Sequence, residues 1–274
     1  MRAGNRIVYP SLQIGHVLVP VFSVMLGVGT ILSMLAALVR AHRCGLDKST
    51  ASGAVLAGVA AGIAGMLTAK WLLGGTVLMG VSSSEAATGW MAAGIGAILW
   101  ALVRRAHVRR LADCLAPPLA LFLMAIGIAS FLAGRAYGKP TDSPLGVTFT
   151  NGVALAWYGT PLGIPLQPTQ LYETILAIGM IAFLAVWERR RFPAGALFLT
   201  FCATYAVGRF ILEFLRGDAD RGFLWLLSIP QWLCLATLVV CAVSFLYADG
   251  WRPLHGVRSH LSGLLHLRHS TQPH

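Results

Sequence analysis

Four side chains able to bind or orient an anion recur at helical spacing in the segment "YAVGRFILEFLRGD", which is otherwise mostly apolar. In order, at i, i+4, i+8 and i+11, they are Tyr205, Arg209, Glu213 and Arg216. An α-helix carries residues at this spacing on one face. Two guanidinium groups, one oriented by a carboxylate, suit a phosphate because each can bind its oxygens through two hydrogen bonds. The pattern therefore predicts an anion site in which Arg209 and Arg216 hold the anion and Glu213 orients Arg209.

The same residues have a second interpretation, in which they bind no ligand. A charge in the middle of a membrane helix costs about 2.5–3.5 kcal/mol on insertion scales, so it persists where it pairs or reaches the headgroup region. Arg209 is predicted to lie about six residues, or roughly 9 Å, from the outer end of its span. Glu213 would then pair with Arg209 at i−4 and with Arg216 at i+3, in a self-neutralised cluster at the membrane surface.

A second polar segment, "QPTQLYE", opens the preceding apolar run. Pro168 suits the start of a helix, and Gln170, Tyr172 and Glu173 follow in its first turns. A carboxylate at this place also stabilises a helix N-terminus without any further role. Since both polar segments are predicted to reach the same face of the membrane, we expect them to share one site.

The composition that surrounds these segments is that of a membrane protein. Of 274 residues, 57% are hydrophobic and 11% are charged, whereas a soluble domain carries about 25% charged residues. Windows of about 20 apolar residues predict the spans. They are Ile14–Val39, Ala51–Leu73, Ala86–Val103, Leu115–Gly134, Leu171–Trp187, Ala194–Leu215 and Leu224–Ala248. The predicted fold is an all-α polytopic bundle of about seven transmembrane helices over residues 1–250, followed by a basic, histidine-rich tail over 251–274.

The distribution of basic residues predicts the orientation of this bundle. The loops after the first, third and fifth spans, together with the tail, hold thirteen of the 21 Lys and Arg residues. They are Arg40, Arg43, Lys48, Arg104, Arg105, Arg109, Arg110, Arg189, Arg190, Arg191, Arg252, Arg258 and Arg268. The positive-inside rule then places the N-terminus outside and the C-terminus in the cytoplasm. Short juxtamembrane clusters of this kind attract anionic lipid, which argues against nucleic acid as the partner despite the net charge of +11.

The segment 135–169 is the longest stretch predicted to lack a helix, and it lies on the outer side. It is rich in Gly and Pro and contains Trp157 and Tyr158. A loop of this length is usually functional, so a lid over a cavity or a membrane-surface segment is expected, with a plain connector as the alternative. The tail histidines are irregularly spaced and the five cysteines lack metal-ligand spacing, so no metal site is expected.

Three segments match, in order, motifs of one known family. "YAVGRFILEFLRGD" is similar to its Tyr-Gly-x-x-Arg-Phe…Glu-Phe-x-Arg signature, and "QPTQLYE" is similar to its His-Pro-Ser/Thr-Gln-Leu-Tyr-Glu. "YGKPTDSPLGVTF", from Tyr137 to Phe149, is similar to its Tyr-Gly-x-Pro-Thr-Asp…Pro-Trp-Gly segment. The chain thus resembles the prolipoprotein diacylglyceryl transferase family, whose members are seven-span enzymes of the bacterial inner membrane.

This resemblance implies a function and a set of site residues. The family moves the diacylglyceryl group of phosphatidylglycerol onto the lipobox cysteine of a lipoprotein precursor and releases glycerol phosphate. The implied partners are phosphatidylglycerol or another anionic phospholipid and prolipoprotein signal peptides, with no cofactor. The implied catalytic residues are Tyr205, Arg209 and Glu213. The implied phospholipid-binding residues are Arg209, Arg216, Gln170, Tyr172 and Glu173.

Several family positions are occupied differently here. Before the Tyr-Gly element the family has Arg-Ile-Gly-Asn-Phe-Ile-Asn-Gly-Glu, whereas this chain has "GIASFLAGR", so Gly127 replaces an arginine and Arg135 a glutamate. Gln167 replaces a histidine, and the stretch Ala87–Gly96 lacks the histidine of a further motif. His16 and Arg135 are the candidate substitutes for the missing groups. The alternative function is a membrane paralogue that binds phospholipid or signal peptides without catalysis.

Overall fold

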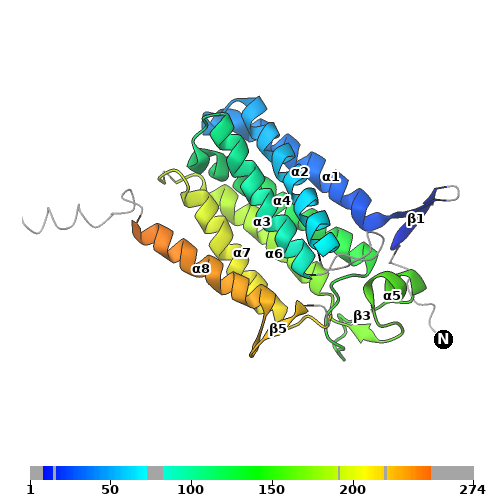
Figure 1. Ribbon diagram of the computed structural model, residues 1–274. Helices are drawn as coiled ribbons and strands as arrows, with labels where there is room; N and C mark the ends of the chain where they lie inside the picture. The colour runs from blue at the N-terminus through cyan, green and yellow to red at the C-terminus, as the bar shows by residue number, and fades with distance from the viewer. Residues whose placement is uncertain (1–8, 15–16, 73–82, 191, 219–220, 248–274) are drawn as a thin grey trace, which may run out of the picture.

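The computed structural model describes residues 9–14, 17–72, 83–190, 192–218 and 221–247 of the chain. They form eight α-helices, seven of them long and one short (Figure 1). The long helices are α1 (Val21–Ala41), α2 (Lys48–Leu72), α3 (Ser83–Val103), α4 (Val108–Ala133), α6 (Thr169–Trp187), α7 (Ala196–Glu213) and α8 (Ile229–Tyr247). The short helix is α5 (Gly152–Tyr158), and a turn of 3-10 helix, η1 (His42–Cys44), follows α1. His16 and the tail lie outside the described residues.

The predicted fold class, an all-α polytopic membrane protein, is confirmed by these helices. Within the described ranges, six helices are long and apolar enough to cross a membrane, namely α1, α2, α4, α6, α7 and α8. The apolar part of α3 is shorter and covers Thr88–Val103. The number of helices that cross the membrane and the side on which each terminus lies stay predictions.

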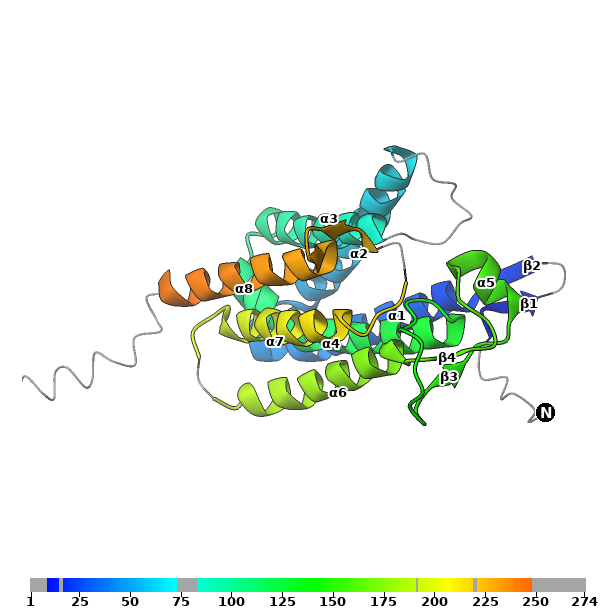
Figure 2. The same cartoon turned by 90° about the horizontal axis from the view of Figure 1, so that it is seen from below.

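Helix α4 occupies the middle of the bundle, where it packs against α1, α6 and α7. Its Ala116 and Ala120 are buried against Met180 of α6 and Phe201 of α7. Small side chains on a central helix let its neighbours approach closely, which matters in lipid because close packing drives helix association there. Helices α6 and α7, which carry the two polar segments, are therefore held together along the same side of α4 (Figure 2).

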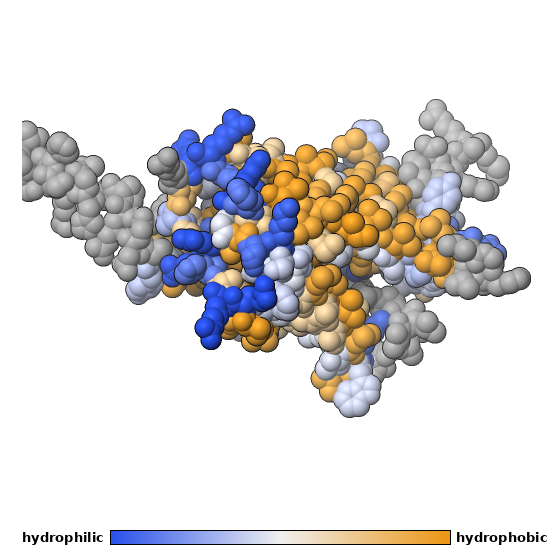
Figure 3. Space-filling view, turned by 90° about the horizontal axis from the view of Figure 1, so that it is seen from above, coloured by the Kyte–Doolittle hydropathy of each residue, from blue (hydrophilic) through white to orange (hydrophobic). Residues whose placement is uncertain are grey.

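The two ends of the bundle differ in character. Figure 3 shows hydrophilic side chains gathered at one end and hydrophobic surface over the helices beyond it. The exposed arginines of this basic end come from the turns after α1, α3 and α6 and from the first turn of α4. They are Arg43, Arg104, Arg105, Arg109, Arg110, Arg189 and Arg190. The loops that the sequence predicts on one side of the membrane thus lie at one end of the molecule.

The opposite end, here called the hairpin end, holds α5 and three short antiparallel pairs of strands (Figure 1). The pairs are β1 (Ser11–Ile14) with β2 (Val17–Pro20), β3 (Val147–Thr148) with β4 (Pro165–Leu166), and β5 (Phe223–Leu224) with β6 (Leu227–Ser228). These pairs shorten two predicted spans. Helix α1 begins at Val21 rather than Ile14, and α8 begins at Ile229 rather than Leu224, because a hairpin occupies the residues before each helix.

The prediction that segment 135–169 lacks a helix is wrong. Helix α5 forms within it because Asn151 caps its N-terminus, with the side-chain oxygen accepting a hydrogen bond of 2.9 Å from the backbone N–H of Val153. Gly159 ends the helix in the left-handed conformation at φ 66°. The segment is therefore a folded cap on the hairpin end rather than an open loop.

Candidate functional site

The two polar segments meet where the first turns of α6 face the last turn of α7. Arg209 Nη1 lies 2.6 Å from Glu213 Oε2 and 3.3 Å from Glu173 Oε1. The three side chains are largely shielded from solvent, with exposures of 12% for Arg209, 1% for Glu213 and 19% for Glu173. The predicted pairing of Arg209 with Glu213, and the expected meeting of the two segments, are both confirmed.

Glu213 has a second arginine partner that the helical spacing did not indicate. Arg221 Nη1 lies 3.3 Å from Glu213 Oε1 and also donates a hydrogen bond of 3.0 Å to the backbone carbonyl of Glu213. The Ser228 hydroxyl donates to the same Oε1 over 3.1 Å. The prediction that Arg216 is the second partner is wrong, because α7 ends at Glu213 and Arg216 lies beyond its helical face.

Arg216 instead pairs with Asp218 and reaches toward α6. Its Nε donates to Asp218 Oδ1 over 2.9 Å, its Nη2 contacts Oδ2, and its Nη1 lies 3.8 Å from Glu173 Oε1. Residues 215–217 also pair with residues 137–139 through backbone hydrogen bonds of 2.9 and 3.0 Å. Burial disfavours the ionised form of Asp218, but the hydrogen bond and charge of Arg216 outweigh it and hold the pKa of this carboxyl below its ordinary value.

These contacts make one charge-balanced cluster, here called the ion network. Its members are Arg209, Arg216, Arg221, Glu173, Glu213 and Asp218. Three guanidinium groups face three carboxylates, and this set of partners differs from the Glu213, Arg209 and Arg216 cluster that the sequence indicates. Asp218 and Arg221 were not singled out beforehand; the signal that contained them was the polar run "RGDADR" directly after the sixth apolar span.

Tyr205 lies on α7 one turn before Arg209. Its ring is nearly parallel to that of Phe201, at an interplanar angle of 6° and a centroid distance of 6.4 Å. The hydroxyl lies within electrostatic range of Arg209 and Glu173. The structure therefore brings Tyr205 beside the ion network, as the helical spacing predicts.

The other expected phospholipid-binding residues of α6 lie in different surroundings. Gln170 is fully buried, and its Nε2 donates a hydrogen bond of 2.7 Å to the backbone carbonyl of Arg135. That contact fixes the chain after α4. Tyr172 is partly exposed, and within the described part of the chain its side chain makes no hydrogen bond to the ion network.

Comparison with known proteins identifies the group to which this architecture belongs. The family model described as prolipoprotein diacylglyceryl transferase matches residues 10–247. The chain belongs to the prolipoprotein diacylglyceryl transferase family.

Individual relatives carry the same description. A phosphatidylglycerol–prolipoprotein diacylglyceryl transferase of Clostridium tetani is 37% identical over 146 residues, which cover 53% of this chain and 56% of that protein. The second such transferase of Clostridium perfringens is 30% identical over 230 residues, covering 80% of this chain and 86% of the relative. One from Geobacter sulfurreducens is 39% identical over 142 residues, covering 47% and 50%. The chain thus spans about half the length of the first and third of these relatives.

Gly127, the position at which the motif resemblance implies a family arginine, lies where α4 approaches the first turns of α6. A Cβ atom at this position would lie 2.3 Å from Thr174 Oγ1 and 3.0 Å from the backbone carbonyl oxygen of Gln170. Such distances leave no room for any side chain without separating the two helices. A side chain at position 127, such as the arginine that the resemblance implies, would therefore need the two helices to move apart.

Arg135, the candidate substitute, follows the left-handed cap of α4 at Gly134. The guanidinium carbon lies 4.3 Å from the ring centroid of Phe22 and 5.9 Å from that of Tyr158. Burial lowers the pKa of Arg135 from its ordinary value, and the side chain also interacts with the charges of Arg216 and Glu173. Arg135 therefore belongs to the surroundings of the ion network in this transferase family member, although it is not an ion-pair member of it.

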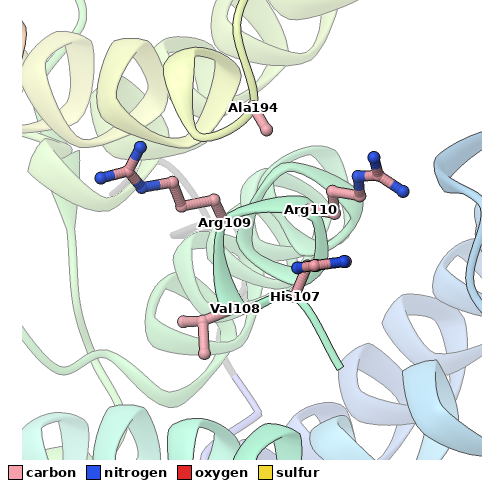
Figure 4. A pocket seen from close by; sticks show the side chains of 5 residues that line it. All are labelled: His107, Val108, Arg109, Arg110 and Ala194. Carbon is pink, nitrogen blue, oxygen red and sulfur yellow. The ribbon is translucent and has the colours of Figure 1, made fainter. Parts of the chain in front are cut away.

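Two cavities open at the basic end, away from the ion network. One, of about 400 Å³, lies between the start of α4 and Ala194, and Figure 4 shows Arg109 and Arg110 on its rim extending in different directions. The other, of about 500 Å³, is lined by residues of α1, α4 and α6 together with Glu188 and Arg189. Neither cavity is lined by a member of the ion network. Among the described residues, no group of three or more His, Cys, Asp or Glu could hold a metal ion.

Proposed function

We propose that this chain transfers the diacylglyceryl group of phosphatidylglycerol to the cysteine of a prolipoprotein. One observation carries the proposal: the two motif segments of a transferase family member meet in a buried arginine–carboxylate network, with Arg209 between Glu213 and Glu173. The relatives named above are described as transferases of this kind. The chain is a multi-pass membrane protein, and we place it in the bacterial inner membrane with the network at the outer surface.

The proposed reaction needs a positive field and an activated thiol. The cysteine sulfur attacks the glycerol carbon that carries the phosphate, the carbon–oxygen bond breaks, and glycerol phosphate leaves with the electron pair. The departing glycerol phosphate gains a second negative charge when this bond breaks. The proton released by the thiol goes to that phosphate and neutralises the added charge. Arg209 and Arg216 supply positive charge toward the departing phosphate, and preorganised charge of this kind lowers the barrier because it needs no rearrangement during the reaction.

The remaining site residues have positioning roles in this proposal. Glu213 fixes the direction of the Arg209 guanidinium, and Tyr205 offers a hydroxyl to the headgroup. Glu173 joins Arg209 to Arg216 across the two helices. Tyr172 contacts the lipid from α6, whereas the buried Gln170 acts through the backbone of Arg135. Prolipoprotein signal peptides are the proposed second partner.

A second candidate function is binding of phospholipid or signal peptides without transfer. The charge balance of the ion network favours it, because all three arginines already have carboxylate partners. The packing at Gly127 favours it as well, since the position of a family arginine is filled by Thr174. Removal of one positioned charge stabiliser typically lowers the rate of the catalysed step by about 10²–10³-fold, so a site without this arginine would favour binding over transfer.

A transfer assay with the purified protein separates the two functions. Phosphatidylglycerol and a lipobox cysteine peptide are mixed with wild type, Arg209→Ala, Arg209→Lys or Arg190→Ala. In a parallel test, genes for these four proteins are expressed in cells depleted of their own transferase, and restored lipoprotein modification is measured. We expect transfer by wild type and Arg190→Ala, since Arg190 is exposed at the basic end. Arg209→Lys should be nearly as inactive as Arg209→Ala because lysine lacks the planar fork. A folded wild type that retains lipid but transfers nothing would support the binding function instead.

A further inference from the structure

Three successive backbone carbonyls after α4 are each held by a buried side chain. The Thr160 hydroxyl donates to the carbonyl of Gly134 over 2.6 Å, Gln170 Nε2 to that of Arg135 over 2.7 Å, and the Thr169 hydroxyl to that of Ala136 over 2.8 Å. All three donors are at most 1% exposed.

These three hydrogen bonds hold the backbone after α4 in a conformation that would otherwise be unfavourable. Ala136 has φ 55°, which a residue with a Cβ rarely adopts, and such conformations persist where the surroundings over-determine them. The donors come from the segment before α6 and from its first turn. The position of Arg135 is therefore specified by the fold rather than left to a free loop.

The guanidinium of Arg135 is positioned by aromatic rings and lacks an anionic partner. It lies 4.3 Å from the ring centroid of Phe22 on α1 and 5.9 Å from that of Tyr158 on α5, both within the range of cation–π contacts. In the described part of the chain it forms no ion pair, whereas every arginine of the ion network has a carboxylate within 4 Å. Aromatic faces leave the edge of a guanidinium, with its N–H donors, free for another ligand.

The charges of the site identify what that ligand would be. The ion network contributes three positive and three negative charges, so Arg135 adds one net positive charge beside it. Arg135 also interacts with Arg216, Asp218 and Glu173, which places it within reach of the network. One uncompensated arginine beside a neutral cluster fits a ligand with one negative charge and oxygen acceptors.

We propose that Arg135 binds the phosphodiester of a monoanionic phospholipid and selects it over a zwitterionic one. The inference rests on the proposed function in that this phosphodiester belongs to the lipid donor of the transfer. A zwitterionic headgroup brings its own ammonium group, which would lie among arginines and gain less from the site. The ion network then keeps its internal pairs when the lipid binds.

Lipid retention tests this role without requiring transfer. Protein is exchanged into nanodiscs of equal parts phosphatidylglycerol and phosphatidylethanolamine, extracted in mild detergent, and analysed for bound lipid by mass spectrometry. Wild type should retain mainly phosphatidylglycerol. Arg135→Gln should lower the ratio of phosphatidylglycerol to phosphatidylethanolamine about tenfold, the effect of one charge-assisted contact. Lys139→Gln is the matched control, since Lys139 is an exposed cation four residues later, and its ratio should equal that of wild type.

A second variant covers the event that Arg135→Gln does not fold, which thermal unfolding would reveal. Phe22→Leu keeps the charge but removes one supporting ring, and we expect a ratio lowered about threefold, as for a contact of modest strength. Unchanged ratios in folded Arg135→Gln or Phe22→Leu would overturn the inference, as would an equal loss in Lys139→Gln.

The transfer assay keeps this inference distinct from the proposed function. An Arg135-dependent lipid ratio without transfer by wild type would retain the binding role and reject the transferase function. Transfer by wild type, together with an unaltered KM for phosphatidylglycerol in Arg135→Gln, would support the transferase function and reject the binding role of Arg135.

Discussion

Glu213→Gln should destabilise the protein more than any comparable change at the basic end. The substitution keeps the shape of the side chain but removes the anion shared by Arg209 and Arg221, at a side chain only 1% exposed. Removal of one partner of a buried ion pair typically costs about 3–5 kcal/mol, because the remaining charge stays buried. Arg209 keeps Glu173 at 3.3 Å and Arg221 keeps Asp218 at 3.7 Å, so we expect the lower end of this range.

Thermal unfolding in detergent measures this effect. A loss of about 3 kcal/mol corresponds to a fall in Tm of roughly 6–12 °C for a chain of this size. The matched control is Glu188→Gln, whose carboxylate pairs with Arg40 at 2.8 Å but is 32% exposed. Solvent screens such a pair, so its loss should cost about 1 kcal/mol or less.

The double variant Glu213→Gln/Arg221→Gln should be less destabilised than the sum of its two single variants, because the arginine left without its anion is also removed. A shift for Glu213→Gln no larger than that for Glu188→Gln would refute the reasoning.

Three further predictions concern packing, pH and topology. Gly127→Ala should lower Tm, and Thr174→Ala should restore part of the loss, because the new Cβ would lie 2.3 Å from Thr174 Oγ1; equal Tm values for Gly127→Ala and wild type would contradict this. Since the folded-state pKa of Asp218 is depressed, its contribution to stability is present above the unfolded-state value of about 3.9 and is lost as pH falls through the lower folded value. Asp218→Asn should therefore flatten the fall in Tm below about pH 4, and an unaltered pH profile would count against the Arg216–Asp218 pair. Reporter fusions at Gly256 and within 143–151 should read cytoplasm and exterior respectively, and the opposite pattern would reject the orientation.

The sequence predicted those contacts of the site that depend on helix geometry alone. Residues four apart on an α-helix are neighbours whatever surrounds them, so the pair Arg209–Glu213 followed from spacing. The pair Glu213–Arg216 failed because α7 ends at Glu213. That end depends on a tertiary contact, the pairing of residues 215–217 with 137–139, which no local pattern encodes.

The same limit explains the irregular structure at the hairpin end. Strands of two residues, such as Phe223–Leu224, leave no alternating pattern long enough to recognise. Helix α5 has seven residues, too few for a periodic apolar face, and its Asn151 cap was not distinguished from an ordinary polar loop residue. The long apolar helices were predicted because the membrane fixes both their length and their composition.

The partners of the arginines also suggest how the two proposals fit together. If Arg209 or Arg216 were to bind the lipid phosphate by releasing its carboxylate, a buried anion would be left unpaired, which costs several kcal/mol. Arg135 can accept a phosphate by using N–H groups that the rings of Phe22 and Tyr158 leave free, so no ion pair has to break. On this reasoning Arg135 binds the donor lipid, while Arg209, held by Glu213 and Glu173, acts on the departing phosphate through its field. Substitution of Arg135 should then raise KM for the lipid, and substitution of Arg209 should lower kcat.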